Sequence, residues 1–344
     1  MALRGAHTGG RKSMKTIGII GAGSWGTALA TVVAGKGHQV RIWDIDEKHL
    51  KTMEENRENT DYLPGVSLNE NINIVYTTKE ALQDADVILF SAPAQHFRTA
   101  LTSAKPFISG DALVINVAKG IEQKSLKRMS EIAAEELDMD RYVVLSGPSH
   151  AEEVGRRLPT TVAAASRNLQ AAEKIQDLFM TDRFRVYTTE DVTGVELGGA
   201  LKNIIALGAG VSDGMGFGDN AKAALMTRGL AEITRLGLKL GARPETFAGL
   251  TGTGDLIVTC TSMHSRNRRC GIMMGEGMSP EEATKKVGMV VEGMFTTEAA
   301  YGLAQREGVE MPITEAIYRV IQGEIKAADA VALLMGRERK HEQG

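Results

Sequence analysis

The stretch Lys15–Thr31, KTIGIIGAGSWGTALAT, decides the fold of this chain. Its apolar start has no polar alternation, which predicts a strand buried on both faces, as in a parallel sheet. Residues 21–26, GAGSWG, then give the pattern G-x-G-x-x-G, and the small apolar residues after them predict a packed helix. A strand, a loop of this pattern and a helix, in that order, form the fingerprint of a dinucleotide-binding site.

Each glycine of the fingerprint has its own physical role. Gly21 permits the tight turn, Gly23 has no Cβ and lets a pyrophosphate approach the backbone, and Gly26 lets the helix lie close to the strand. The helix N-terminus offers free N–H groups and a partial positive charge to the phosphates. A second strand is predicted at 38–43, and Asp44 at its end can accept hydrogen bonds from both ribose hydroxyls. These features favour a bound dinucleotide over an incidental strand–turn–helix.

The composition bounds the fold and excludes several functions. A chain of 344 residues suggests two domains. The net charge of −3 provides no basic field for nucleic acid or a membrane surface, and no apolar run approaches the roughly 20 residues of a membrane span. Cys260 and Cys270 do not suffice for a zinc site, and no histidine cluster helps them, so we expect no metal. A disulfide between them is possible by count, but reduced thiols in a cytoplasmic protein are favoured.

The first residues of the chain differ in character from the rest. Residues 1–13, MALRGAHTGGRKS, are basic, contain glycine and show no hydrophobic periodicity. They lack the apolar core of a secretory signal, so we expect a disordered leader. A very short organelle transit peptide is the alternative, because the segment has no acidic residue.

Strands and helices alternate up to about residue 190, which predicts a doubly wound parallel sheet. Beyond Asp191 the patterns are helical only. We therefore expect an α/β fold: a Rossmann-type dinucleotide-binding domain at 14–193, followed by an all-α domain at 194–344 and joined to it through a continuous helix. The predicted strands are 17–20, 38–43, 72–76, 85–90, 112–117, 142–145, 161–165 and 184–187, and the predicted helices of the second domain are 195–209, 221–240, 281–287, 297–306, 314–321 and 327–335.

Two lysines are candidates for the chemistry. Lys119 follows the strand predicted at 112–117, which places it at the carboxyl edge of the sheet, where open α/β sheets bind ligands. Lys202 lies in the apolar segment 198–207 near the domain joint, and burial there would lower its pKa toward neutrality and let it donate and accept a proton. The alternatives are a solvated surface lysine at 119 and a lysine whose stem covers apolar surface at 202.

The segment 265–269, SRNRR, is a candidate phosphate site, because guanidinium groups match the geometry of phosphate oxygens. Its alternative is an exposed basic helix face. Asp255 lies among Gly, Leu, Ile and Val, where it can orient Lys202, hold a substrate hydroxyl or, as the alternative, cap a helix. Together with Lys119, these groups indicate an anionic substrate that bears a hydroxyl or a carbonyl.

Nine motifs occur along the chain in this order: IGIIGAGSWGTALA (17–30), NVAKGIE (116–122), LSGPSHAEEV (145–154), GVELGGALKNIIALGAG (194–210), DGMGFGDNAKAALMTRGLAE (213–232), GTGDLIVTC (252–260), SRNRR (265–269), VVEGMFTT (290–297) and MPITEAIY (311–318). They resemble the bacterial-type NAD(P)-dependent glycerol-3-phosphate dehydrogenases, over nearly the whole chain from about Lys15 to Lys340. The resemblance implies reversible reduction of dihydroxyacetone phosphate to sn-glycerol 3-phosphate, a phospholipid precursor, with NAD or NADP. It also implies a cytoplasmic homodimer that uses no metal.

The resemblance assigns roles to individual residues. Lys202 resembles the catalytic proton donor and acceptor at the C2 oxygen of the substrate, and Lys119 resembles a second active-site lysine that contacts substrate and cofactor. The positions that match substrate-binding residues are Lys119, Gly147, Ser149, Lys202, Asp255, Ser265, Arg266 and Asn267. The cofactor-binding positions, including those of the fingerprint, are Gly21, Gly23, Ser24, Trp25, Gly26, Asp44, Lys119, Ala151, Arg266, Val290 and Glu292.

The residues after the second strand bear on the choice of cofactor. Asp44 would repel the 2′-phosphate of NADP, and Ile45 cannot pair with it, so we predict a preference for NADH. His150 lies beside the predicted substrate loop and is not assigned a catalytic role.

Two other classes share parts of this pattern. A β-hydroxyacid or 6-phosphogluconate-type dehydrogenase also joins a dinucleotide domain to a helical domain and uses a lysine, but the motifs at 252–260 and 265–269 fit the glycerol phosphate family better. A non-catalytic cofactor-sensing protein would not need Lys119, Lys202 and Arg266 together.

Overall fold

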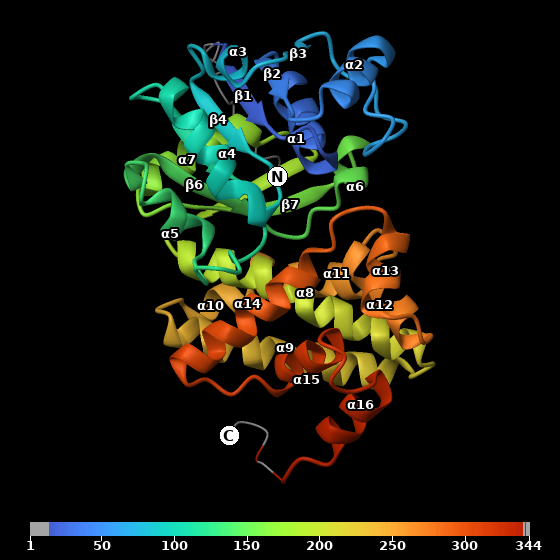
Figure 1. Cartoon of the computed structure of the whole chain (residues 1–344). Helices are drawn as coiled ribbons and strands as arrows, with labels where there is room; N and C mark the ends of the chain where they lie inside the picture. The colour runs from blue at the N-terminus through green and yellow to red at the C-terminus, as the bar shows by residue number, and fades with distance from the viewer. Residues whose placement is uncertain (1–13, 340, 342–344) are drawn as a thin grey trace, which may run out of the picture.

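The structure of the protein is a computed structural model that describes residues 14–339 and 341, so the leader predicted at 1–13 lies outside the described residues. A sheet flanked by helices forms the first part of the chain, and helices alone form the second (Figure 1). The change falls at Asp191, which caps the long helix α8 (Val192–Gly214) by accepting a hydrogen bond from Gly194 N. The predicted fold class is therefore confirmed.

The described part of the chain contains one sheet of eight strands, in the order β3-β2-β1-β4-β5-β6-β7-β8. The order reverses on either side of β1, which is the arrangement that opens a ligand crevice at the carboxyl ends of the strands. The strands are β1 (Thr16–Ile20), β2 (Gln39–Trp43), β3 (Ile72–Ile74), β4 (Val87–Phe90), β5 (Leu113–Asn116), β6 (Tyr142–Ser146), β7 (Thr160–Ala165) and β8 (Phe184–Thr189).

The prediction of a wholly parallel sheet is wrong at one place. β6 and β7 pair antiparallel, with Leu145 opposite Ala164, whereas the other neighbouring strands are parallel. Only residues 147–159 connect these two strands, and they contain the short helix α6 (Ala151–Gly155). The chain therefore re-enters the sheet at the edge where β6 ends and does not cross back to the other edge, as a parallel connection does.

Apolar helices cover both faces of the sheet. Ile19 and Leu89 belong to the core on one face, and Ile20 and Phe90 to the core on the other, because successive side chains of a strand point in opposite directions. The first core is shared with α1 (Ser24–Ala34), α2 (Glu47–Asn56), α6 and α7 (Leu169–Phe179), and the second with α3 (Thr78–Leu82), α4 (Phe97–Ala104) and α5 (Met129–Ala133).

In the second part of the chain, helices pack around α8, which is buried along most of its length. These helices are α9 (Asp219–Lys239), α10 (Pro244–Ala248), α11 (Asp255–Thr261), α12 (Arg266–Gly275), α13 (Pro280–Val287), α14 (Glu292–Glu307), α15 (Pro312–Ile321) and α16 (Ala327–Met335). The sequence patterns did not predict α10, α11 and α12, because they are short and their charged or small residues weaken the helical period. None of the described helices is both long and apolar enough to cross a membrane.

Helices α8 and α12 touch through their backbones. A Cβ on Gly210 would lie 2.1 Å from Arg268 O, and a Cβ on Gly271 would lie 2.1 Å from Leu207 O. Glycine is therefore required on both helices for this close approach. The contact fixes the first residues of α12 against the middle of α8, where Lys202 lies.

Candidate active site

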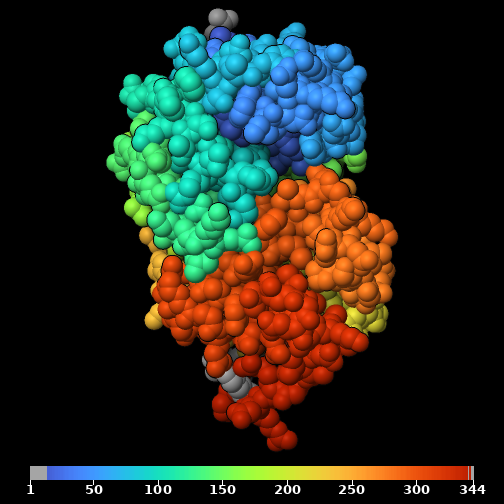
Figure 2. All heavy atoms as spheres, in the orientation of Figure 1, coloured from blue at the N-terminus to red at the C-terminus, as the bar shows by residue number. Residues whose placement is uncertain are grey.

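A cleft of about 910 Å³ lies between the carboxyl edge of the sheet and the helices α11 to α14. Figure 2 shows the sheet part, in blue and green, meeting the orange helices that close the cleft from below. The predicted site residues that line it are Gly21, Gly23, Ser24, Trp25, Asp44, Lys119, Ser149, Ala151, Lys202, Ser265, Arg266, Asn267, Val290 and Glu292. Gly26, Gly147 and Asp255 do not line the cleft; each supports a neighbouring residue that does.

The glycine loop fits the pyrophosphate of a dinucleotide. Gly21 has a φ of +107°, and a Cβ on Gly26 would lie 2.2 Å from Gly21 O, so α1 starts directly against the turn. No described atom lies within 4 Å of the place where a Cβ on Gly23 would be, so the cleft begins at the backbone there. The N-terminus of α1 opens at the same point, which suits an anionic group.

Asp44 is held at the end of β2 by backbone donors. Its Oδ2 accepts a hydrogen bond from Ala22 N at 2.7 Å and its Oδ1 accepts one from Asp46 N at 3.1 Å. Arg41, two residues earlier, donates to carbonyls of the α3 region and is turned away from the cleft, while the side chain of Ile45 is exposed. The surroundings of Asp44 therefore contain a carboxylate for ribose hydroxyls and no arginine for a 2′-phosphate.

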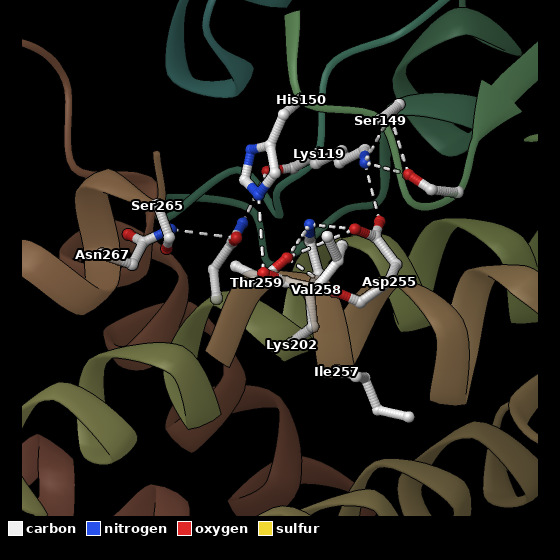
Figure 3. Close-up of polar contacts among 12 residues, drawn as sticks. Lys119, Ser149, His150, Lys202, Asp255, Ile257, Val258, Thr259, Ser265 and Asn267 are labelled. Carbon is white, nitrogen blue, oxygen red and sulfur yellow. Dashed lines mark hydrogen bonds and ion pairs between the residues drawn. The ribbon is translucent and has the colours of Figure 1, made fainter. Parts of the chain in front are cut away.

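The two candidate lysines meet on one buried carboxylate (Figure 3). Lys119 Nζ donates to Asp255 Oδ2 at 2.7 Å and to Gly147 O at 2.9 Å. Lys202 Nζ donates to Asp255 Oδ1 and, at 2.6 Å, to Thr259 Oγ1. Asp255 is 1% exposed. Each of its two carboxylate oxygens accepts a hydrogen bond from one lysine, and the two lysines come from different parts of the chain.

Burial and mutual repulsion tune these groups. The pKa of Lys202 is lowered to about 8: burial is the main cause, Asp255 opposes the shift, and the charge of Lys119 adds to it. Burial alone would raise the pKa of Asp255, but the two lysines hold it below its ordinary value. The site therefore contains a fixed carboxylate and a lysine that can lose its proton near neutral pH.

Local backbone features bring these side chains together. Two glycines of α8 allow close contacts: a Cβ on Gly198 would lie 2.4 Å from Thr251 O, and one on Gly199 would lie 2.7 Å from Ser146 Oγ. Residues 250–254 form a turn of π-helix before α11, and Asp255 is the first residue of α11. This turn places Asp255 against α8 beside Lys202, which lies one helical turn after Gly198.

Side-chain amides connect α8, α12 and α14. Asn267 Nδ2 donates to Asn203 Oδ1 at 3.0 Å, and Asn267 Oδ1 accepts from Gly293 N at 2.8 Å. Asn203, next to Lys202 in the sequence, donates to Lys119 O at 3.5 Å. Because of this chain of contacts, the start of α12 lies beside the two lysines.

The three arginines of the SRNRR segment do not act alike. Ser265 caps α12 and accepts from Arg268 N at 3.2 Å. Arg268 forms an ion pair with Asp213, with Nη2 to Oδ2 at 2.7 Å, and belongs to the structure of the helical part. Arg266 and Arg269 line the cleft instead, so two of the three arginines of the predicted phosphate site reach it.

Two predicted cofactor contacts have buried polar atoms without hydrogen-bond partners among the described residues. These atoms are Trp25 Nε1 and Glu292 Oε2. The other oxygen of Glu292 accepts from Ala94 N at 3.1 Å, and burial raises the pKa of this carboxyl group. Together with Gly23, these atoms fit a ligand that presents both donors and acceptors, as a dinucleotide does. The described part of the chain contains no cluster of three or more His, Cys, Asp or Glu side chains that could hold a metal ion.

Sequence reasoning missed cleft residues such as Thr259 and Tyr62, and it named His150 without giving it a role. Thr259 follows Asp255 by four residues, so a predicted helix there would have placed them on one face. His150 lies with Nε2 3.4 Å from Val258 O, and burial together with Lys202 lowers the pKa of its ring. Tyr62 packs its ring edge-on against His49, with centroids 4.8 Å apart, through a loop contact that no local pattern indicates.

The fold and this arrangement of groups define a class: a dehydrogenase that binds a nicotinamide dinucleotide at its sheet and carries a helical second part. Residues 16–172 match the N-terminal part of the NAD-dependent glycerol-3-phosphate dehydrogenases, and residues 191–332 match their C-terminal part. The chain belongs to this family.

Curated relatives and a solved structure agree with the family. A glycerol-3-phosphate dehydrogenase (NAD(P)+) of Pelotomaculum thermopropionicum is 55% identical, over 95% of this chain and 94% of the relative. One of Bacillus thuringiensis is also 55% identical, over 96% of this chain and 98% of the relative. The crystal structure of glycerol-3-phosphate dehydrogenase from Coxiella burnetii is 40% identical, covers 94% of this chain and 99% of that chain, and superimposes with a TM-score of 0.91.

Proposed function

We propose that this protein interconverts dihydroxyacetone phosphate and sn-glycerol 3-phosphate with NAD(H) or NADP(H). The observation that carries the proposal is the meeting of Lys119 and Lys202 on the buried carboxylate of Asp255, at the edge of a cleft that also holds the dinucleotide fingerprint. The names of the relatives support the reaction, and the matched family supports the cofactor.

Lys202 is the general acid and base of the reaction. The nicotinamide, when bound, supplies or accepts the hydride at C2 of the substrate. Lys202 donates a proton to the C2 oxygen during reduction and removes it during oxidation; its pKa of about 8 keeps both forms populated near neutral pH. Lys119 adds a positive charge that stabilises the negative charge developing on this oxygen. Asp255 and Thr259 hold the lysines in place and do not react.

The substrate is held by its phosphate and by the loop that follows β6. Arg266 faces the cleft at the start of α12, where the helix N-terminus adds a partial positive charge. Ser265 and Asn267 flank Arg266. The side-chain amide of Asn267 donates one N–H to Asn203 and accepts from Gly293, so its second N–H is available to the substrate. On the opposite side, Ser149 Oγ donates to Gly147 O at 2.8 Å, so the loop presents this hydroxyl beside Lys119.

A bound dinucleotide would extend from the glycine loop to the lysines. Gly21, Gly23, Ser24 and Trp25 would surround the pyrophosphate, Asp44 would accept from the adenosine ribose, and Ala151, Arg266, Val290 and Glu292 would complete the site with Lys119. Gly26 would contribute by letting α1 lie against the turn. Asp44 favours NADH over NADPH, because a 2′-phosphate would meet its negative charge.

Further parts of the proposal rest on the family resemblance and on the composition. They are a homodimer in the cytoplasm, glycerol phosphate supplied for phospholipid synthesis, and a division into domains at 14–193 and 194–344. The net charge of −3 supports the absence of nucleic-acid binding.

The direct test follows the oxidation of NADH and of NADPH at 340 nm with dihydroxyacetone phosphate and a panel of other ketones, including β-keto acids. We expect turnover with dihydroxyacetone phosphate and a large loss with unphosphorylated dihydroxyacetone. Preference for a β-keto acid would instead favour a β-hydroxyacid dehydrogenase. Tight binding of NADH without turnover of any ketone would favour a cofactor sensor.

A further inference from the structure

Arg269 lines the cleft, but the proposed mechanism gives it no role. It lies one turn after Arg266 on α12, and both side chains line the cleft. Its Nε is buried and has no hydrogen-bond partner among the described residues. The adjacent Arg268 points elsewhere, where it pairs with Asp213 and donates from Nη1 to Thr261 O at 3.1 Å.

A partly buried guanidinium group whose Nε has no partner favours binding of an anion. Arginine stays protonated in proteins, and a buried N–H without a partner carries a desolvation cost. The carboxylates that line the cleft belong to Asp44, Asp46, Glu152 and Glu292. Asp44, Asp46 and one oxygen of Glu292 accept hydrogen bonds from backbone N–H groups. Among residues 14–339, no carboxylate forms an ion pair with Arg269.

The wall of the cleft around Arg269 is cationic. Lys285 of α13 also lines it, is exposed, and forms no ion pair with any residue that the structure describes. The facing wall, made of the glycine loop and residues 44–46, contributes lining residues that are neutral or acidic. The helical part therefore supplies the side-chain cations of Arg266, Arg269 and Lys285 to the cleft, in addition to Lys202 and to Lys119 at the sheet edge.

The position of Arg269 along α12 separates it from the reacting groups. The start of α12 is held beside the lysines through Asn267 and Asn203. Each turn of an α-helix advances by about 5.4 Å, so Arg269 lies further along α12. The following residue, Cys270, contacts α13, with Sγ 3.8 Å from Thr284 Oγ1. In Figure 1, α12 and α13 lie below α6, on the side of the molecule that also holds α1 and α2.

We propose that Arg269 binds phosphate oxygens of the cleft ligand through its guanidinium fork, and that these oxygens belong to the pyrophosphate of the dinucleotide. This inference rests on the proposed function and deepens it, because it adds a ligand from the helical part to the cofactor site. Lys285 adds charge at the same place. The phosphate of the triose is the second source of the same chemistry, and the experiment separates the two.

The experiment measures the Kd of NADH by fluorescence titration, without substrate, for wild type, Arg269→Gln, Arg269→Lys and the control Lys286→Gln. Lys286 is exposed on α13 and is not among the residues that line the cleft, so its substitution removes a nearby charge without removing the contact. We expect Arg269→Gln to raise the Kd by about ten-fold to one hundred-fold, the scale of a charged hydrogen bond. Arg269→Lys keeps the charge but loses the fork and should raise the Kd by less, and Lys286→Gln should leave it within about two-fold.

Three other results would overturn the proposed contact between Arg269 and the pyrophosphate, and each has a different consequence. An unchanged Kd of NADH together with a raised KM for dihydroxyacetone phosphate would overturn the assignment to the dinucleotide and place the contact on the triose phosphate. Unchanged values for both ligands would overturn the contact altogether, while the proposed function would stand. A wild type that binds neither NADH nor NADPH would overturn both. Thermal unfolding shows whether Arg269→Gln is folded; if it is not, Arg269→Lys decides, and an unchanged Kd there overturns the inference.

Discussion

Lys119 and Asp255 lie 136 positions apart in the sequence and form a 2.7 Å ion pair between the sheet edge and α11. The pair joins the two parts of the chain at the point where Lys202 enters from α8. Because Asp255 is almost fully buried, both lysines depend on it for their placement. A single buried carboxylate thus couples the packing of the helical part to the position of the groups that face the substrate.

We predict that Lys202→Ala abolishes most turnover and leaves the affinity for NADH nearly intact. A general acid or base typically contributes 10²- to 10⁴-fold to the rate, and lost charge stabilisation adds to this. The measurement is kcat for dihydroxyacetone phosphate reduction beside a fluorescence titration with NADH. A variant that keeps a tenth or more of the wild-type kcat would remove Lys202 from the mechanism.

The pH dependence should follow the protonation of Lys202. During ketone reduction this lysine must carry its proton, so kcat/KM should be constant below its pKa of about 8 and fall as the pH rises through it. Oxidation of glycerol 3-phosphate needs the neutral lysine, so its rate should rise over the same range. In Asp255→Asn, loss of the carboxylate that opposes the downward shift should move the reduction profile to lower pH. Profiles that fall together in both directions, or that do not move in the variant, would contradict this assignment.

How far the sequence could predict the fold depends on how local each signal is. Buried strands such as β4 and β5 are continuous apolar runs, which the sequence shows directly. The antiparallel direction of β7 depends on the short connection at 147–159, which carries no local mark of direction. Helices α11 and α12 form because α8 covers them, so their tertiary contacts outweigh the weak periodicity of their sequences.

The candidate site shows the same division. The glycine loop and Asp44 have fixed spacing, and their positions in the cleft could be predicted without a structure. The idea that Asp255 orients Lys202 also came from sequence, yet the arrival of Lys119 at the same carboxylate did not, because it depends on how the two parts of the chain pack. Arg268 and Arg269 are neighbours in sequence with different surroundings, which only the contacts of α12 reveal.

Arg266→Ala should raise the KM for dihydroxyacetone phosphate by about one to two decades and barely affect unphosphorylated dihydroxyacetone. The reason is the loss of a charge-assisted contact to phosphate, which contributes roughly 1.5–3 kcal/mol. Steady-state kinetics with both ketones at saturating NADH provide the comparison. Equal losses for the two ketones would show that Arg266 serves the structure or only the cofactor.

Glu232 should make stability depend on pH. This residue of α9 is 3% exposed and accepts from Ile313 N at 2.7 Å and Thr314 N at 3.2 Å, at the start of α15. Burial raises its pKa from 4.5 to about 7, although these hydrogen bonds oppose the shift. The folded chain therefore binds the proton more tightly, so its stabilising contribution is complete below about pH 4.5 and is lost as the pH rises through about 7. Relative to Glu232→Gln, which cannot titrate, the wild-type unfolding free energy should decrease between pH 5 and 8; a constant difference in urea unfolding would refute this.

The last prediction is that the protein uses NADH better than NADPH. Asp44 follows β2, and its carboxylate is held by Ala22 N and Asp46 N. We expect it to face the adenosine ribose of a dinucleotide that lies on the glycine loop. A 2′-phosphate would bring like charges together there, and neither the apolar Ile45 nor Arg41, bound to carbonyls elsewhere, offers a counter-ion. The test compares kcat/KM for both cofactors in wild type and in Asp44→Gly with Ile45→Arg, which should shift the ratio toward NADPH by one or more decades. Equal use of NADPH by the wild type would defeat the prediction, and a double variant without any gain would show that Asp44 does not face the ribose.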